Sequence, residues 1–141
     1  MKLEKEKLPK ELVARALAVA KIAHRGQFRR NGVTPYIKHP VAVAAPMPTD
    51  LLKAIAVLHD VPEKSTVTLA DLAKLFPTEV VDAVDALTHR KGESYEHYIE
   101  RANKNPIARK VKLADLFCNL SDAPTEKQKR KYLGAFKRMV R

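Results

Sequence analysis

A histidine and an aspartate stand side by side at the end of an apolar segment of the chain. His59 and Asp60 follow the apolar residues 56–58, and Pro62 comes two positions after Asp60. A buried carboxylate is costly unless a cation or several hydrogen bonds compensate its charge. Imidazole and carboxylate ligands without thiolate suit manganese, iron or zinc. The pair therefore indicates a divalent metal site whose other ligands lie elsewhere in the chain.

Another acidic residue lies within an apolar segment nearer the C-terminus. Asp115 and Asn119 are four positions apart, so they share one face of a helix. One interpretation makes Asp115 a metal ligand and directs the Asn119 amide into the same cavity. The alternative is an ion pair with Lys112, three positions earlier, on a solvated stripe of the helix. With His39, which precedes Pro40, the first interpretation gives a set of two histidines and two aspartates.

Apolar periodicity, capping residues and prolines predict the elements that position these side chains. No convincing period-2 strand or hairpin signal occurs, so we expect an all-α, compact bundle of about seven or eight helices. Pro62 should stop the third helix just after Asp60. His59 and Asp60 then lie in a fraying last turn, whose distortion lets two adjacent residues face one ion. Helices are expected over residues 9–24, 39–45, 49–60, 68–76, 78–87, 94–102, 106–122 and 125–139.

Length and composition narrow the class of protein. At 141 residues, the chain is expected to form one domain, residues 1–141. The single cysteine, Cys118, excludes an internal disulfide and favours a reducing, cytoplasmic location. No segment approaches the length of an apolar membrane span. The charged first residues also give no sign of a targeting signal.

The charge of the chain favours anionic partners. Lys and Arg number 27 against 16 Asp and Glu, which gives a formal net charge of +11. Nucleotides, nucleic acid and acidic surfaces all suit such a chain. The few aromatic residues among the basic ones argue against a stacking platform for single-stranded nucleic acid.

Four motif blocks occur in a fixed order along the chain. They are Ala23-His24-x-Gly26-Gln27-Phe28-Arg29-Arg30-Asn31-Gly32, Pro35-Tyr36-Ile37-x-His39-Pro40 with Val43-Ala44, Leu58-His59-Asp60-Val61-x-Glu63, and Lys112-Leu113-Ala114-Asp115-x-x-x-Asn119-Leu120. This order resembles the HD-superfamily phosphohydrolases. Within them it is most similar to the alarmone hydrolases, namely the hydrolase half of the RelA/SpoT proteins and the small stand-alone hydrolases of the Mesh1 type. The similarity spans roughly residues 12 to 135 and implies an HD-domain helical bundle.

The resemblance implies a metal-dependent hydrolase. It assigns one divalent ion, typically manganese with iron or zinc as alternatives, to four ligands, namely His39, His59, Asp60 and Asp115. A bound cation lowers the pKa of its water and so generates a nucleophile for phosphorus. Glu63 matches the catalytic acid that orients or deprotonates this water, with a plain loop carboxylate as the alternative.

The resemblance also implies residues that bind the substrate. Arg29 and Arg30 fall where the family places basic residues against the guanine base and the phosphates, and a guanidinium suits either role. Which arginine has which role stays open. Tyr36 and Asn119 are candidates for ribose or base contacts.

Three further histidines are interpreted differently. His24 matches a family position, but a histidine at a helix end with a structural hydrogen bond is an equal alternative. His89 and His97 have no motif context, and we expect both to be surface residues.

The chain departs from the family pattern at Lys64. The family usually has a second acid after the catalytic glutamate, whereas this chain reads Glu63-Lys64. The loss of that acid would reduce the usual activity, whereas a lysine that reaches the phosphates would stabilise developing charge or change the substrate. We therefore count Lys64, with Glu63 and Asp60, among the candidate catalytic residues.

The sequence thus favours hydrolysis of the 3′-pyrophosphate of ppGpp or pppGpp, the alarmones of the stringent response. Three alternatives remain open at this stage. The same site could cleave another phosphorylated nucleotide, including the 2′-phosphate of NADPH. The chain could be a non-catalytic nucleotide sensor, for which Lys64 is the argument. The third alternative is a nucleic-acid-binding protein, for which the positive net charge is the sole argument. The sequence does not indicate an oligomeric state.

Overall fold

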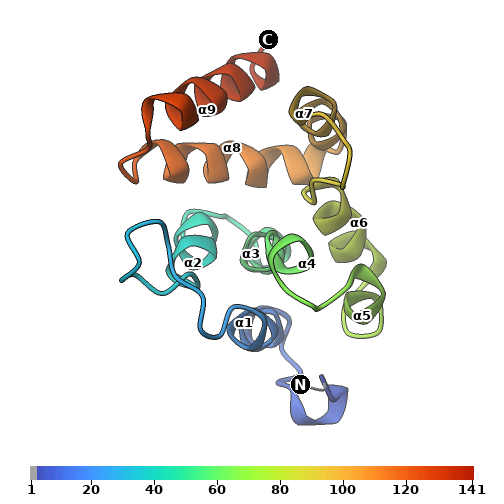
Figure 1. The fold of residues 1–141 in the computed structure, drawn as a ribbon. Helices are drawn as coiled ribbons and strands as arrows, with labels where there is room; N and C mark the ends of the chain where they lie inside the picture. The colour runs from blue at the N-terminus through green and yellow to red at the C-terminus, as the bar shows by residue number, and fades with distance from the viewer. Residues whose placement is uncertain (1–2) are drawn as a thin grey trace.

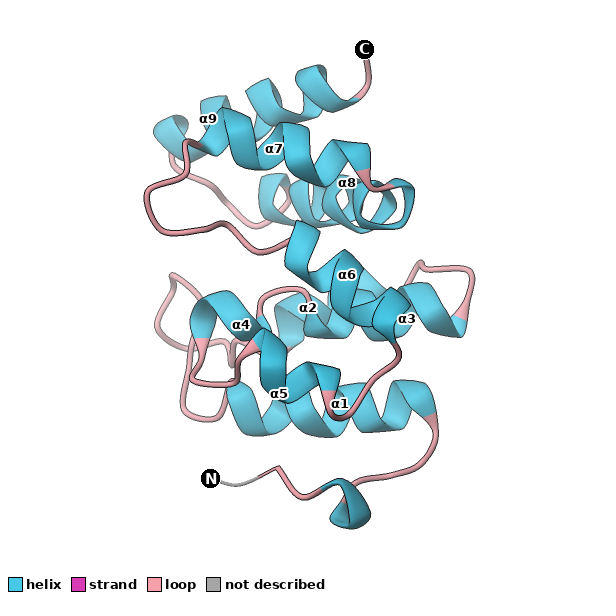
Figure 2. Cartoon of the chain, turned by 90° about the vertical axis from the view of Figure 1, so that its right-hand side faces the viewer, coloured by secondary structure: helices cyan, strands magenta, loops and turns pink. Residues whose placement is uncertain are grey.

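The computed structural model describes residues 3–141, and all regular elements within them are helices (Figures 1 and 2). Met1 and Lys2, which belong to the expected domain, lie outside the described residues. A short 3₁₀ helix, η1, is followed by α-helices α1 to α9. Their bounds are η1 Lys5–Lys7, α1 Leu12–Ala23, α2 Lys38–Ala44, α3 Asp50–Leu58, α4 Val61–Lys64, α5 Leu69–Ala73, α6 Thr78–Ala86, α7 Tyr95–Lys104, α8 Pro106–Leu120 and α9 Glu126–Met139.

The predicted all-α class and the eight predicted helices are confirmed, and the structure adds a ninth, the one-turn α4. Pro62 was expected to stop the third helix just after Asp60, but α3 already ends at Leu58 and Pro62 lies in the first turn of α4. A proline is tolerated there because the first N–H groups of a helix have no partner within the helix. Asp60 is consequently the N-cap residue of α4 rather than part of the last turn of α3.

The helix starts follow the predicted capping chemistry at most positions. The Thr49 and Ser94 side chains accept hydrogen bonds from Leu52 N and His97 N. Capping boxes form at Thr68 and at Thr125. Thr78 suits an N-cap by residue type and was expected to cap this helix, but the N-cap of α6 is Pro77 and Thr78 is already helical. Helix boundaries shift by a residue in this way when tertiary packing sets where the chain enters the helix.

The helices form two layers joined by α6. Helices α1 to α5 make one layer, and α7 to α9 make the other, with α8 lying across α2 and α3 (Figure 1). Helix α3 is at the centre of the larger core, because it contacts α1, α2, α6 and α8. Its residues 54–58 are all buried, as expected for a helix that is apolar on every side. A smaller core of Tyr98, Ile99, Leu116, Ala135 and Met139 joins α7, α8 and α9.

The loop between α1 and α2 has a defined shape. Phe28 and Pro35 form an isolated antiparallel bridge, and Arg29 N donates to Thr34 O at 2.8 Å. The Asn31 side chain accepts from two backbone amides of the turn, and Gly32 adopts a φ of 72°. Only glycine takes that conformation without strain. No hairpin signal is present in the sequence, and this single bridge is too short to count as a strand.

Among the described residues, no helix is both long and apolar enough to cross a membrane.

Candidate metal centre and substrate cleft

Three of the four predicted metal ligands meet between the two helical layers. One potential ligand atom from each of His39, His59 and Asp115 lies within 4.8 Å of the other two, and all three residues are buried. His39 lies in the first turn of α2, His59 caps the end of α3 and Asp115 lies on α8. The Asp115 Oδ1 atom lies 2.8 Å from His39 Nε2 and 3.3 Å from His59 Nε2.

Asp60 approaches the same cluster from its edge. Its Oδ2 atom lies 3.2 Å from His59 Nε2 and 3.9 Å from His39 Nε2. It also accepts a hydrogen bond of 2.6 Å from the Tyr36 hydroxyl. Because α3 ends at Leu58 and α4 begins at Val61, His59 and Asp60 lie between the two helices, and their side chains reach the same cluster. The predicted set of four is therefore brought together.

The donor atoms fit a divalent cation. His59 Nδ1 lies 2.6 Å from the Ala56 carbonyl oxygen, which accepts its proton and leaves the Nε2 lone pair of the neutral ring directed at the cluster. This buried Nε2 atom makes no well-aligned hydrogen bond among the described residues, although the Asp60 and Asp115 oxygens lie 3.2 and 3.3 Å from it. A backbone carbonyl behind a ligating imidazole is the usual second contact of a metal site. Two imidazoles and two carboxylates form a ligand set that Mn²⁺, Fe²⁺ and Zn²⁺ all accept.

The Asp115 carboxylate also forms the ion pair with Lys112, at 2.9 Å from Oδ2. The alternative interpretation expected this ion pair on a solvated stripe of the helix. That location was wrong, because both side chains are buried. The pair and the cluster coexist, since Oδ1 faces the imidazoles and Oδ2 faces Lys112. Asn119 Nδ2 donates to Oδ1 at 3.2 Å and completes the surroundings of the carboxylate.

The charged groups of the cluster shift one another's pKa values. Burial alone would raise the pKa of Asp115, but Lys112 and His59 hold it well below its usual value. Burial likewise favours the neutral form of Asp60, and His59 outweighs it and lowers the pKa of that carboxyl. Burial lowers the pKa of His59, but Asp60 and Asp115 outweigh burial and raise it well above the usual value. Both carboxylates are therefore ionised, and they attract a cation or a proton to the same place.

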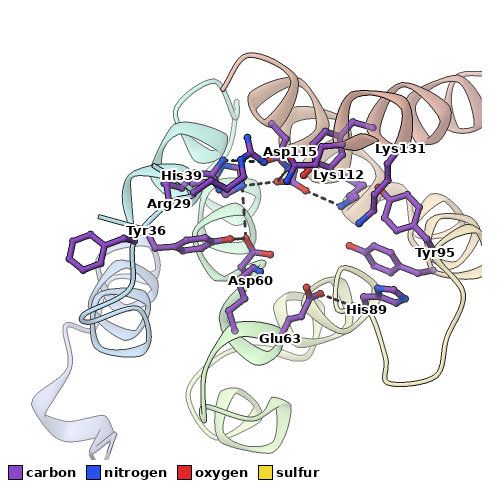
Figure 3. Close-up of a pocket in the computed structure, with 17 residues that line it drawn as sticks. Arg29, Tyr36, His39, Asp60, Glu63, His89, Tyr95, Lys112, Asp115 and Lys131 are labelled. Carbon is purple, nitrogen blue, oxygen red and sulfur yellow. Dashed lines mark hydrogen bonds and ion pairs between the residues drawn. The ribbon is translucent and has the colours of Figure 1, made fainter. Parts of the chain in front are cut away.

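A cleft of about 390 Å³ opens over the cluster (Figure 3). His59 does not line it, because its ring lies behind the others with 2% exposure. All other predicted site residues line the cleft: Arg29, Arg30, Tyr36, His39, Asp60, Glu63, Lys64, Asp115 and Asn119. The walls come from both helical layers, so the cleft exists only in the folded chain.

The two arginines of the α1–α2 loop have different settings. Arg29 donates to Asp122 Oδ2 through two nitrogens, at 2.8 and 3.0 Å, and to Asn119 Oδ1 at 3.2 Å. Its guanidinium carbon lies 5.6 Å from the centre of the Tyr36 ring. Arg30 donates to the Asp122 backbone carbonyl and is exposed. Arg29 is thus held in place at the cleft wall, whereas Arg30 is tied by one contact to the rim.

Glu63 and Lys64 lie on α4 at the opposite side of the cleft mouth. The Glu63 Oε1 atom accepts a 3.0 Å hydrogen bond from the His89 backbone N–H. The Lys64 ammonium lies 5.7 Å from the centre of the Tyr36 ring, on the side of the site that carries Asp60. The backbone carbonyl of Lys64 accepts from the Gln27 side chain at 2.7 Å, which ties α4 to the loop after α1.

The remaining histidines divide as follows. His24 is buried at the end of α1, where Nδ1 donates to Gln27 Oε1 at 2.8 Å, as the structural alternative expected. Its ring packs against Tyr36 at 4.9 Å between centroids. His97 is exposed, as expected. The expectation for His89 was wrong, because it is partly buried, stacks on Tyr98 and lines the cleft.

Sequence reasoning also missed the aromatic and basic wall that faces Arg29. Most of its residues come from α7, α8 and α9, where their helical spacing is the same as that of core positions, whereas Phe28 and His89 lie in the loops before α2 and α7. Only the packing of the three helices shows that one side of this row faces the cleft. The missed lining residues are Phe28, His89, Tyr95, Tyr98, Lys112, Gln128, Lys131 and Tyr132.

Comparisons with known proteins agree with this geometry. No family model matches the chain. It is 35% identical over 148 residues to a probable GTP pyrophosphokinase of Mycobacterium leprae, a match that covers 92% of this chain and 19% of that protein. It is 46% identical over 83 residues to a guanosine-3′,5′-bis(diphosphate) 3′-pyrophosphohydrolase of Vibrio cholerae, covering 55% of this chain and 12% of that protein.

Two further comparisons involve proteins described as SpoT or its ortholog. The chain is 41% identical over 88 residues to the bifunctional (p)ppGpp synthase/hydrolase SpoT of Escherichia coli, covering 57% of this chain and 12% of that protein. The chain thus spans less than a fifth of the length of these curated relatives. A solved structure of a metazoan ortholog of SpoT, described as hydrolysing ppGpp, matches with a TM-score of 0.76 and 27% identity. That match covers 94% of this chain and 85% of the other.

Proposed function

This chain has the ordered motifs and the fold of an HD-type ppGpp hydrolase domain, and we propose that residues 1–141 act as one metal-dependent phosphohydrolase domain. We propose ppGpp and pppGpp as substrates, with water cleaving the 3′-pyrophosphate. The observation that carries the proposal is the cluster of His39, His59, Asp60 and Asp115 at the floor of a cleft lined with cationic side chains. Manganese is the proposed ion.

The proposed role of each cleft residue follows from its position. His39, His59, Asp60 and Asp115 would hold the ion, which supplies an acidified water and neutralises phosphate charge. Glu63, exposed at the cleft, is proposed to orient the attacking water and accept its proton. Tyr36 orients Asp60 through its hydroxyl, and Asn119 orients Asp115 through its amide.

Arg29 is the proposed contact for the guanine base or the phosphates. Its guanidinium is already oriented by Asp122 and Asn119, so less rotamer entropy is lost when a substrate binds. Arg30, Tyr36 and Asn119 are proposed as further substrate contacts, because they line the same wall.

A hydrolysis assay tests the proposal. Purified protein with Mn²⁺ would be offered ppGpp, pppGpp, their adenosine analogues, NADPH and plain nucleotides, while phosphate and pyrophosphate release is followed. We expect pyrophosphate release from ppGpp and pppGpp, and loss of this activity in a His59→Ala, Asp60→Ala variant. Turnover that survives the double substitution would refute the metal mechanism. Nucleotide binding without turnover would favour a sensor, and phosphate release from NADPH alone would identify another substrate.

Lys64 tests the chemistry at the position where the family usually has an acid. It lies beside Tyr36 and one residue from Glu63, so a carboxylate there could share the proton transfer. We expect Lys64→Asp to increase the kcat for ppGpp, because it restores that acid. Lys64→Ala serves as the control for loss of the lysine alone. An unchanged or lower kcat in Lys64→Asp would show that the lysine does not limit the reaction.

A further inference from the structure

The carboxylate of Glu63 depends on a loop that lies far away in sequence. Its Oε1 atom accepts the backbone N–H of His89, 26 positions later, at 3.0 Å. Helix α4 has only four residues and ends at Lys64, so the short helix gives the Glu63 side chain little support of its own. The position of the His89 N–H is therefore part of what orients this carboxylate (Figure 3).

The His89 N–H is in turn fixed by the α6–α7 loop, residues 87–94. Arg101, on α7, clamps this loop with its guanidinium. It donates to the backbone carbonyls of Asp85 at 3.0 Å and Thr88 at 2.7 Å, two residues that precede His89 in the chain. It also donates to both carboxylate oxygens of Glu93, which follows His89 in the chain, at 2.9 Å.

Glu93 closes the loop from inside. Its Oε1 atom accepts the Arg90 backbone N–H at 3.0 Å, and its side chain is only 7% exposed. The hydrogen bonds from Arg101 hold the pKa of the Glu93 carboxyl well below its usual value. A charged, well-bonded carboxylate of this kind is a strong acceptor. The Glu93–Arg101 pair therefore restrains the loop around His89.

Two further contacts fix the His89 residue itself. Its ring stacks on Tyr98 with 4.9 Å between centroids and 15° between planes. The His89 Nε2 atom lies 2.6 Å from the Glu93 carbonyl oxygen, which accepts its proton. Tyr98 also donates to the Leu87 carbonyl at 2.9 Å. The loop is thus bonded at each end and packed in the middle.

We propose that Arg101 and Glu93 are positioning residues for Glu63, acting through the backbone N–H of His89. Neither side chain lines the cleft, so their effect on catalysis passes through the loop. The inference rests on the proposed role of Glu63 as the group that orients the attacking water. A displacement of such a group by about 1 Å can decrease the rate by about a hundred-fold.

The same region offers a matched control. Arg90 and Asp85 form an ion pair at 3.2 Å, with side chains 54% and 41% exposed. An exposed pair contributes little to stability. The Asp85 contact to Arg101 uses the backbone carbonyl, which Asp85→Asn retains. Asp85→Asn therefore changes a charge in the same region without removing a bond that supports His89.

Steady-state kinetics on ppGpp with saturating Mn²⁺ test the proposal. We expect Arg101→Gln to decrease kcat by about ten- to a hundred-fold, with KM and Mn²⁺ affinity unchanged. In a Glu63→Ala background, Arg101→Gln should decrease kcat no further, because the group it positions is absent. A merely structural role would instead give additive losses. Additive losses, or a normal kcat in Arg101→Gln, would overturn the proposal, as would an equal decrease in Asp85→Asn.

Two measurements keep the result interpretable. Arg101→Lys keeps the charge but cannot bond both carbonyls and Glu93 at once, so it should show the same kinetic defect even if Arg101→Gln fails to fold. Hydrogen exchange of the His89 amide tests the loop without any turnover. We expect protection in the wild type and in Asp85→Asn, and its loss in Arg101→Lys. If no substrate is hydrolysed but this protection pattern holds, the proposed function fails and the positioning of Glu63 stands. An unprotected wild-type amide would overturn the positioning itself.

Discussion

The Asp115 carboxylate shows how much one residue contributes at this site. One oxygen faces two imidazoles and the other accepts from Lys112, so a single side chain joins the metal cluster to the basic wall of the cleft. Burial favours the neutral form of Lys112, but Asp115 outweighs it and raises the pKa of the ammonium well above its usual value. Lys112 therefore stays charged inside the protein and balances the acid when no ion is bound.

Removal of Lys112 tests this balance at the residue scale. We expect Lys112→Met to destabilise the metal-free protein by about 3–5 kcal/mol, because a buried carboxylate loses its partner. Urea denaturation without metal measures the change, and added Mn²⁺ should recover part of it by compensating Asp115. Lys110→Met, on the same helix, is the control. A loss of only about 0–1 kcal/mol would mean that the pair behaves as a surface ion pair.

At the scale of the elements, the shape of the α1–α2 loop determines where Arg29 and Arg30 lie. The bridge between Phe28 and Pro35 and the turn at Asn31 bring both arginines over α8 and the loop that follows it. Gly32 makes that turn possible through its positive φ. The sequence shows the glycine, but not that the loop folds back across the cleft.

Two glycine substitutions with opposite signs test this element. A Cβ at Gly32 would meet no atom within 4 Å, so the cost of Gly32→Ala comes from its φ alone. We expect a loss of about 1–2 kcal/mol in the free energy of unfolding and a higher KM for ppGpp. Gly134 lies inside α9, and its added Cβ would also meet no atom within 4 Å. Gly134→Ala should stabilise by up to about 1 kcal/mol. Equal effects at both positions would contradict the role of the turn.

At the scale of the whole molecule, the candidate metal centre forms because three distant segments meet. His39, His59 and Asp115 come from α2, α3 and α8, and the contacts of α8 with α2 and α3 bring them together. The buried carboxylates that attract an ion also attract protons to His59. Metal binding and protonation therefore compete throughout this cluster.

The competition predicts a pH dependence of metal affinity. Asp60 and Asp115 raise the pKa of His59 well above its usual value in the metal-free protein. The ring therefore holds a proton up to a higher pH than an ordinary histidine and must release it to bind an ion. We expect the apparent Mn²⁺ affinity, measured by calorimetry, to rise with pH through the neutral range. Binding should also release protons, which calorimetry detects as a binding enthalpy that changes with the ionisation enthalpy of the buffer. An affinity independent of pH between about 6 and 8, the range around the ordinary histidine pKa, would contradict this competition.

The sequence by itself determined the helical class, eight of the nine α-helices among residues 3–141 and the identity of the four candidate ligands. Periodicity, capping residues and prolines are local properties, so they can be read along the chain. The sequence missed α4 because a proline at a helix end and a proline in a first turn look the same. It misjudged His89 for a similar reason, since its neighbours along the chain do not show what packs against it.

Only the tertiary structure decided what these residues do together. It placed the Lys112–Asp115 pair in the interior and brought the His89 N–H to Glu63. It also bonded Arg29 to the side chains of Asp122 and Asn119, and Arg30 to the Asp122 backbone carbonyl. Each of these contacts joins side chains whose separation depends on how α8 crosses α2 and α3, or on how the α6–α7 loop packs. Such distances follow from the packing of a complete core, and no local pattern in the chain encodes them.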